Sequence, residues 1–252
     1  MPQVNSSCGL LLACSSRDTS RATVRARLLF LFSKEPRPGK VKTRLTPPLT
    51  AAQAARCQEA FLEDLLRRMS RVARVVVCAT PDHDAPRLQT LAAAAGADLV
   101  WQGAGDLGRR MERMLVSART RDAAGVIIGA DSPDLPLTYV EKAFDLLEEP
   151  GIVLGPSADG GYYLVGCRGD VPSIFDLGPA WAGPRVFALT MEAVRDLAVA
   201  HHLLPEWEDV DDFEGLRRLS ARLRSGEAMS RGGEFRACEQ LIEFLAREGV
   251  SL

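Results

Sequence analysis

The amino-acid sequence predicts an α/β fold in which helices cover both faces of a mostly parallel central sheet. From Arg27 onward, short apolar runs alternate with longer amphipathic stretches, which is the pattern of strands separated by helices. The runs are apolar at consecutive positions, as in strands buried on both faces of a parallel sheet. The chain has 252 residues, 46% hydrophobic and 25% charged. It can therefore bury a large core, and its composition excludes a disordered, collagen-like or coiled-coil chain.

The first half of the chain contains the clearest elements. Apolar runs predict strands over residues 28–32, 74–79, 98–101 and 125–130. Amphipathic stretches predict helices over residues 50–69, 85–95 and 106–121. Asp106 stands where it can cap the third of these helices. The fourth strand is rich in β-branched residues and is followed directly by a carboxylate, Asp131. Asp131 is therefore a candidate functional residue.

The second half is less regular. Two further strands are predicted over residues 152–155 and 162–166, with a turn at 157–161 between them. Helices are predicted over residues 184–200, 213–224 and 234–247. Because no linker interrupts this series, residues 27–252 are predicted to form a single domain. Residues 1–26 are rich in Ser and Arg without apolar periodicity, which predicts a disordered N-terminal extension.

Charge and cysteine content restrict the class of protein further. The 31 basic and 33 acidic residues nearly balance, so no overall field favours nucleic acid or an anionic membrane. Six scattered cysteines indicate reduced thiols rather than a zinc site or a disulfide framework. Residues 11–14 resemble a lipoprotein cleavage box, but no basic residue precedes Arg17 and the apolar run is short. We therefore expect a cytoplasmic protein without a membrane span.

A basic loop follows the first predicted strand. Residues 34–44 hold five basic residues and one acid, and in a parallel sheet such a loop lies at the carboxyl ends of the strands, where ligands bind. Prolines and Gly39 restrict its backbone, while Lys34, Lys42 and Arg44 can hold phosphate oxygens. A solvated basic loop is the alternative interpretation. The loop has neither of the two common glycine-rich phosphate-binding patterns.

Carboxylates occur at two further places that suit a divalent metal. Asp131 ends the fourth strand, where a carboxylate needs a positive partner, and Mg²⁺ or Mn²⁺ bound with substrate phosphates would supply one. Ser132 or Asp134 could instead cap the next helix. Asp209 and Asp211 alternate in a late extended segment and would share one face. Together with Asp131 they predict a metal site, with Asp209 the weaker candidate.

Two glycine-containing turns complete the set of candidates. Gly105 and Asp106 open a helix whose N-terminus could face a base, a ribose or a phosphate, or could be a tight turn alone. The run 159–161, Asp-Gly-Gly, permits close approach of a ligand to the backbone, although a plain hairpin turn explains it equally well. The three histidines, namely His83 in an Asp-rich loop and the adjacent pair His201 and His202, form no catalytic arrangement, which argues against catalysis by a histidine base.

These motifs, in this order, resemble those of the GT-A-fold "radical-SAM/selenodomain-associated transferase 1" family of the nucleotide-diphospho-sugar transferase superfamily. The resemblance covers about residues 27–219. Five motifs carry it, among them Gln-Gly-x-Gly-Asp-Leu-Gly-x-Arg-Met at 102–111, Gly-x-Asp-x-Pro-Asp-Leu-Pro at 129–136 and Gly-Pro-x-x-Asp-Gly-Gly-Tyr-Tyr-Leu at 155–164. A more distant similarity extends to molybdopterin-guanine and phospholactate nucleotidyltransferases. The resemblance implies a three-layer GT-A sandwich and a nucleotide-binding transferase.

The resemblance also implies roles for individual residues. Lys34, Lys42 and Arg44 would bind phosphates, and the catalytic set would be Lys42, Arg44 and Asp131. Asp131 and Asp211 would hold Mg²⁺ or Mn²⁺. The turn at Gly105 and Asp106 and the turn of Asp159, Gly160 and Gly161 would contact the nucleoside or the acceptor.

Three functions are compatible with the sequence. The first is a glycosyltransferase-like enzyme that uses a sugar nucleotide as donor. The second is a nucleotidyltransferase that joins a nucleoside triphosphate to a phosphorylated acceptor and releases pyrophosphate. Both need a metal and cations against phosphate charge, so the same residues serve either reaction and only the product distinguishes them. The third is a non-catalytic nucleotide-binding protein. The acceptor, the base and the oligomeric state are not determined by the sequence.

Overall fold

A seven-stranded sheet organises the protein in this computed structural model, which describes residues 26–225 and 238–250. The strand order is β3-β2-β1-β4-β6-β5-β7. All neighbouring strands are parallel except β6, which runs antiparallel to both β4 and β5. The strands are β1 (Arg27–Lys34), β2 (Arg74–Thr80), β3 (Asp98–Trp101), β4 (Ala124–Gly129), β5 (Gly151–Pro156), β6 (Tyr162–Arg168) and β7 (His201–Leu203).

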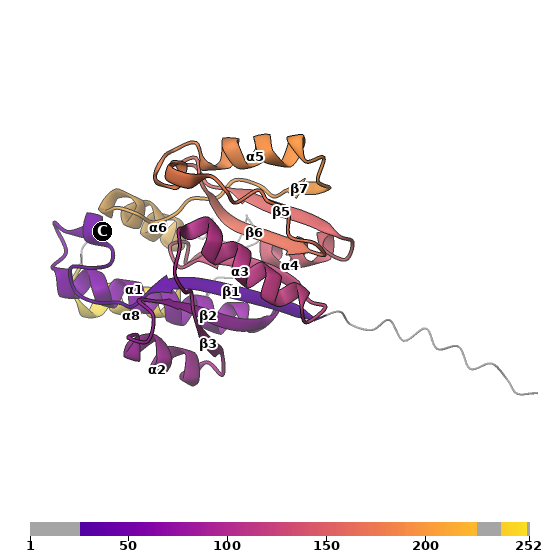
Figure 1. The fold of residues 1–252 in the computed structure, drawn as a ribbon. Helices are drawn as coiled ribbons and strands as arrows, with labels where there is room; N and C mark the ends of the chain where they lie inside the picture. The colour runs from indigo at the N-terminus through magenta and orange to yellow at the C-terminus, as the bar shows by residue number, and fades with distance from the viewer. Residues whose placement is uncertain (1–25, 226–237, 251–252) are drawn as a thin grey trace, which may run out of the picture.

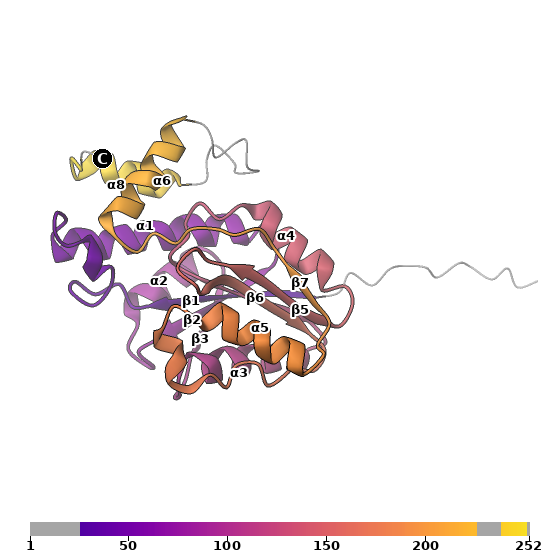
Figure 2. The same ribbon diagram turned by 90° about the horizontal axis from the view of Figure 1, so that it is seen from above.

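Helices cover both faces of this sheet (Figures 1 and 2). The main helices are α1 (Ala51–Met69), α2 (Pro86–Ala94), α3 (Leu107–Arg119), α4 (Leu137–Leu146), α5 (Val186–Asp196), α6 (Phe213–Ser225) and α8 (Glu239–Arg247). Two short 3-10 helices, η1 (Thr43–Leu45) and η2 (Gly178–Ala182), lie in loops. The predicted mostly parallel α/β sandwich is confirmed.

Alternate residues of β1 show how the two faces are built. Leu29 and Leu31 pack into the cluster formed with α1, α2 and α4, whereas Leu28, Phe30 and Phe32 pack into the cluster formed with α3 and α5. This follows from the two-residue period of a strand, which sends neighbouring side chains to opposite faces. Burial on both faces explains why the run looks uniformly apolar in the sequence.

A third apolar cluster lies on the outer side of α1. There Phe61 packs with Leu216 of α6 and with Leu241 and Phe244 of α8, and Figure 2 shows both helices outside α1. The buried carboxylate of Asp64 accepts hydrogen bonds from the backbone N–H groups at the start of α8. The last helix is therefore attached by both apolar packing and a long-range cap.

Two sequence expectations need correction, and two others lie outside the described residues. The predicted helix over 184–200 is shorter, since α5 ends at Asp196 and an edge strand, β7, begins at His201. That strand is only three residues long and exposed, so it carries no apolar pattern. No side chain caps α4, whose N-cap residue is Pro136, so the expected caps Ser132 and Asp134 have other roles. The predicted disordered extension and residues 234–237 of the last predicted helix lie outside the described residues.

None of the helices in the described part of the chain is both long and apolar enough to cross a membrane. The three histidines are exposed, as expected. Four of the cysteines, Cys57, Cys78, Cys167 and Cys238, are buried free thiols. Burial raises the pKa of the Cys57 thiol to about 12, so this group stays protonated and inert at neutral pH.

Candidate functional site

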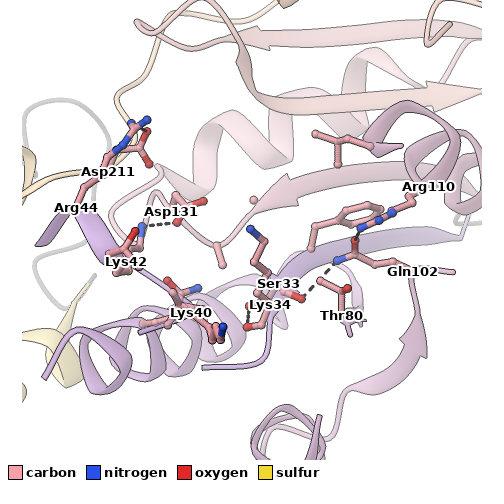
Figure 3. A pocket seen from close by; sticks show the side chains of 17 residues that line it. Ser33, Lys34, Lys40, Lys42, Arg44, Thr80, Gln102, Arg110, Asp131 and Asp211 are labelled. Carbon is pink, nitrogen blue, oxygen red and sulfur yellow. Dashed lines mark hydrogen bonds and ion pairs between the residues drawn. The ribbon is translucent and has the colours of Figure 1, made fainter. Parts of the chain in front are cut away.

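The candidate site is a pocket of about 650 Å³ at the carboxyl ends of the parallel strands (Figure 3). The segments that follow β1, β3 and β4 reach it, together with Thr80 at the end of β2, the start of α3 and Asp211 of the loop over residues 204–212, here called the late loop. The lining includes Ser33, Lys34, Lys40, Val41, Lys42, Thr43, Arg44, Thr80, Gln102, Leu107, Arg110, Gly129, Ala130, Asp131 and Asp211. The loop after β1 thus lies where ligands bind in open α/β sheets.

The charge of this pocket differs from that of the whole chain. Five of its lining residues are basic, namely Lys34, Lys40, Lys42, Arg44 and Arg110, and two are acidic, Asp131 and Asp211. The chain as a whole has a formal net charge of −2. A local excess of cations in a concave site attracts an anion with several charges, such as a diphosphate.

Lys42 is the most constrained of these cations. Its backbone is left-handed, with φ of 46°, a conformation that costs a residue other than glycine about 1 kcal/mol or more. Its side chain is only 4% exposed and contacts the Asp131 carboxylate. The ammonium also donates to the carbonyl oxygen of Val210 at 2.7 Å and lies 5.1 Å from the ring centroid of Phe61. Lys42 therefore joins the basic loop, the end of β4 and the late loop.

Arg44 is held differently. Its side chain is 75% exposed and its guanidinium lies 3.7 Å from the Asp211 carboxylate. Figure 3 shows the pair at the rim of the pocket. Lys34, the last residue of β1, is exposed and points into the centre of the pocket. Gly39 has a φ of +74° and open space around it, so it turns the loop.

The acidic residues divide between two places. Asp131 and Asp211 line this pocket, and burial together with the charge of Asp131 raises the pKa of Asp211. Asp209 does not line it. Its carboxylate accepts hydrogen bonds from Ser132 and from Ser157, the latter at 3.0 Å, and burial raises its pKa to about 6. Asp209 lines a second pocket, together with Asp159, and the charges of Asp131 and Asp159 act on both Asp209 and Asp211. A shared metal-binding role for Asp209 and Asp211 stays a prediction.

The donor set suits a metal that keeps substrate ligands. Within residues 26–225 and 238–250, no three Asp, Glu, His or Cys side chains are placed to hold a metal ion together. Two carboxylates completed by phosphate oxygens and water are the usual ligands of Mg²⁺. Asp131 and Asp211 fit this chemistry, and their mutual repulsion is the property that a cation between them would relieve.

The loop that carries Asp131 is clamped by side chains from distant helices. The buried guanidinium of Arg68 donates to the carbonyl oxygens of Pro133 and Leu135, at 2.7 and 2.8 Å. The buried Asp134 carboxylate pairs with Arg222 at 3.0 Å. Asp134 therefore anchors the loop and does not cap α4. Sequence reasoning missed both arginines because each lies in a helix that carries other arginines, and the sequence alone does not mark which of them is turned inward.

The turn before α3 is built by its own polar residues. Asp106 caps α3 by accepting a hydrogen bond from the N–H of Arg109 at 2.9 Å, as expected. The carbonyl of Gly105 accepts from Arg110 at 2.8 Å. The side chains that line the pocket here are those of Gln102, Leu107 and Arg110. A ligand role for Gly105 and Asp106 remains a prediction.

A second pocket of about 250 Å³ adjoins the first, since Phe32, Leu107 and Gly129 line both. Asp159, Gly161 and Asp209 line this second pocket as well. Gly160, between Asp159 and Gly161 in the sequence, is not among the residues that line this pocket.

Gly160 has a φ of +89°, and a Cβ there would lie 1.9 Å from the carbonyl oxygen of Pro184. This glycine allows the turn to pack against the start of α5, where its own carbonyl accepts a hydrogen bond from the N–H of Phe187 at 2.9 Å.

Comparison with known proteins agrees with this fold. A solved protein from Desulfovibrio desulfuricans G20, provisionally named as a nucleotide-diphospho-sugar transferase, is 31% identical with a TM-score of 0.76, over 89% of this chain and 95% of that one. The fold and the pocket thus define a member of the nucleotide-diphospho-sugar transferase-like superfamily. Residues 64–181 match the family model DUF2064, described as "Uncharacterized protein conserved in bacteria". The chain belongs to this family.

More distant structures share the fold alone. A cytidylyltransferase from Leptospira borgpetersenii serovar Hardjo-bovis is 15% identical with a TM-score of 0.51, over 89% of this chain and 95% of that one. The 4-diphosphocytidyl-2C-methyl-D-erythritol synthase from Anaerococcus prevotii DSM 20548 is 9% identical with a TM-score of 0.51, over 79% and 99%. No curated protein matches the chain. The fold is therefore one that nucleotide-using transferases adopt.

Proposed function

We propose that this protein is a metal-dependent transferase that uses a nucleotide-activated donor, most simply a sugar nucleotide. The observation that carries the proposal is the pocket at the strand ends, in which five basic residues surround two carboxylates. A nucleoside diphosphate group carries charge of the sign that the cations attract, and it supplies the oxygens that a metal between Asp131 and Asp211 would still need.

Each charged residue then has a task. Lys34, Lys40 and Arg44 bind the phosphates, and Arg110 faces them from the start of α3. Bound Mg²⁺ or Mn²⁺ would be held by Asp131 and Asp211 and would neutralise charge on the leaving phosphate.

Lys42 keeps the Asp131 carboxylate in place and adds a positive charge beside the same phosphates. Its burial makes it a fixed cation, which stabilises developing charge without reorganisation.

Nucleotidyl transfer is the alternative reaction. The shared fold of the two distant structures supports it, since one is named a cytidylyltransferase and the other a diphosphocytidyl synthase. The pocket alone serves either reaction, because both develop negative charge on phosphate. A non-catalytic nucleotide-binding protein would have less need of a buried Lys42 paired with Asp131.

The test is a product assay. The protein is incubated with Mg²⁺ or Mn²⁺ and either a panel of sugar nucleotides or the nucleoside triphosphates with sugar phosphates. Release of nucleoside diphosphate supports the proposal, and release of pyrophosphate supports the alternative. Binding of nucleotides without any turnover, in the parent protein and in Asp131→Asn alike, would contradict both reactions.

A further inference from the structure

The second pocket has the opposite charge to the first. Among the described residues that line it, Asp159 and Asp209 are acidic and none is Lys or Arg. The first pocket has five basic residues. A phosphate group in the second pocket would therefore face carboxylates without a cation to compensate, which disfavours binding.

The wall of the second pocket is aromatic and firmly built. The indole N–H of Trp181 donates to the carbonyl oxygen of Phe175 at 3.2 Å, which fixes the ring. Tyr162 meets Trp181 edge to face, with ring centroids 6.2 Å apart. Gly108 of α3 makes room for this arrangement, because a Cβ there would lie 2.7 Å from the indole nitrogen of Trp181. Gly108 thus shapes the pocket by packing.

The combination of an aromatic wall with carboxylate acceptors selects a particular chemistry. An apolar ring face packs against aromatic side chains, and hydroxyl groups donate to carboxylates. The pocket volume of about 250 Å³ suits a single small ring. Asp159 is exposed, and one of its oxygens accepts from the N–H of Gly161 at 2.9 Å. The carboxylate is therefore oriented by the turn that carries it.

The two pockets meet at a position without a side chain. Gly129, the last residue of β4, lines both pockets. A Cβ at Gly129 would have no neighbour nearer than 4.0 Å, at the backbone nitrogen and one carboxylate oxygen of Asp131. Space and backbone conformation both permit a Cβ here, so Gly129→Val tests the passage by narrowing it with its γ carbons.

We propose that the second pocket binds an uncharged, hydroxyl-bearing ring, and that the reacting partner at this end of the site is not phosphorylated. The inference rests on the proposed function, because it takes the first pocket as the site of the nucleotide diphosphate. It favours transfer involving a neutral sugar-like ring over transfer to a phosphorylated acceptor. The ring belongs either to the donor or to the acceptor, and the binding experiment separates these sources.

The experiment measures binding by calorimetry in the presence of Mn²⁺. The ligands are nucleoside diphosphates, the matching sugar nucleotides, neutral monosaccharides added to the nucleotide-loaded protein, and monosaccharide phosphates added in the same way. The proteins are the parent, Asp159→Asn, Gly129→Val and the control Asp170→Asn, whose side chain is 91% exposed and lies outside both pockets. Circular dichroism melts verify that each variant folds.

If the ring belongs to the donor, the parent binds sugar nucleotide more tightly than nucleoside diphosphate. Asp159→Asn then lowers the affinity for sugar nucleotide about tenfold, the usual loss for a hydrogen bond to a charged group. The affinity for nucleoside diphosphate does not change. If the ring belongs to the acceptor, Asp159→Asn leaves the affinity for both nucleotides unchanged and lowers only the affinity for the neutral monosaccharide. Gly129→Val weakens binding of the ring-bearing ligand more than binding of nucleoside diphosphate, since Gly129 lines both pockets. Asp170→Asn has no effect.

Two results would overturn the inference. One is that monosaccharide phosphates bind the nucleotide-loaded protein better than their neutral counterparts. The other is that nucleoside diphosphate binds the parent normally while neither Asp159→Asn nor Gly129→Val alters any ring-bearing ligand. Failure of the parent to bind any nucleoside diphosphate would instead refute the proposed function, and this inference with it.

Discussion

The ammonium of Lys42 is buried against the carboxylate of Asp131. The same ammonium donates to the carbonyl of Val210, whose own N–H donates to the carbonyl of Asp131 at 2.8 Å. Three segments that are distant in the sequence are thereby fixed around one ion pair. Asp131 itself is half exposed, with a side-chain exposure of 48%, so its carboxylate is paired and still accessible from the pocket.

This pairing predicts the stability of Asp131→Asn. The sequence alone suggests that the variant melts at the same temperature or higher, because a repulsion between carboxylates is relieved. With the pair in view, we expect the opposite sign: the variant leaves a buried ammonium without its carboxylate, at a cost of about 1–3 kcal/mol. Urea unfolding of the parent, Asp131→Asn, Lys42→Met and the double variant measures this cost and the coupling between the two residues.

In that cycle, Lys42→Met removes the charge and keeps most of the volume. We expect the double variant to be more stable than the sum of the single losses predicts, with a coupling of about 1–2 kcal/mol. Additive losses would show that the ion pair contributes nothing to folding. Metal-dependent nucleotide binding should be lost in Asp131→Asn whatever its stability.

Arg44 predicts a separable effect on binding. Its guanidinium is mostly exposed and its pair with Asp211 is at the rim, so Arg44→Ala should alter the melting temperature little. Nucleoside diphosphate affinity should fall about tenfold, through loss of a charge-assisted hydrogen bond to phosphate. Calorimetry at two salt concentrations measures this effect, which should shrink at high salt. Lys142→Ala, on α4 outside the pocket, is the matched control and should not change the affinity.

The sequence predicts the sheet and the basic loop well because both depend on local patterns. The apolar runs mark β1 to β6, and the charges of the loop after β1 mark the phosphate side of the site. The clamps on the Asp131 loop could not be predicted in this way. Arg68 and Arg222 contact it through the tertiary fold, and nothing in their own helices distinguishes them from exposed arginines.

The glycines of the turn at residues 159–161 also show which features the sequence alone does not predict. Asp159-Gly160-Gly161 was predicted to let a ligand approach the backbone, and two of its members do line a pocket. Gly160 instead approaches another part of the chain. A glycine requirement is visible in the sequence, but whether a ligand or a backbone segment imposes it depends on what the fold places opposite.

Gly39 and Gly160 both have a positive φ, but we expect substitution by alanine to destabilise the protein by different amounts at the two positions. Gly160→Ala should destabilise the protein by more than about 2 kcal/mol, because the new Cβ would lie 1.9 Å from the Pro184 carbonyl oxygen and the backbone cannot yield easily. Gly39→Ala meets nothing within 4 Å, so only its left-handed conformation costs energy, about 1 kcal/mol. Thermal melts of both variants compare them directly. Equal losses would show that the Gly160 turn can relax away from α5.

Asp64 predicts a pH dependence of stability. Burial raises the pKa of this carboxyl above its usual value, although the backbone N–H groups of Gln240 and Leu241 oppose the shift. Between the pKa of the unfolded chain and that of the folded protein, the native state binds more protons. Its contribution to stability is therefore largest at low pH and is lost as the pH rises through this window.

Asp64→Asn should remove that contribution, since an amide does not titrate. We expect the difference in unfolding free energy between parent and variant to change across the acidic range, with the parent losing stability relative to the variant as the pH rises to neutral. Asn retains one acceptor for the start of α8, whereas Asp64→Leu removes the cap and should be about 1–3 kcal/mol less stable than Asp64→Asn at every pH. Urea unfolding at a series of pH values measures both effects. If the difference in unfolding free energy between the parent and Asp64→Asn does not vary with pH, the raised pKa of Asp64 is contradicted.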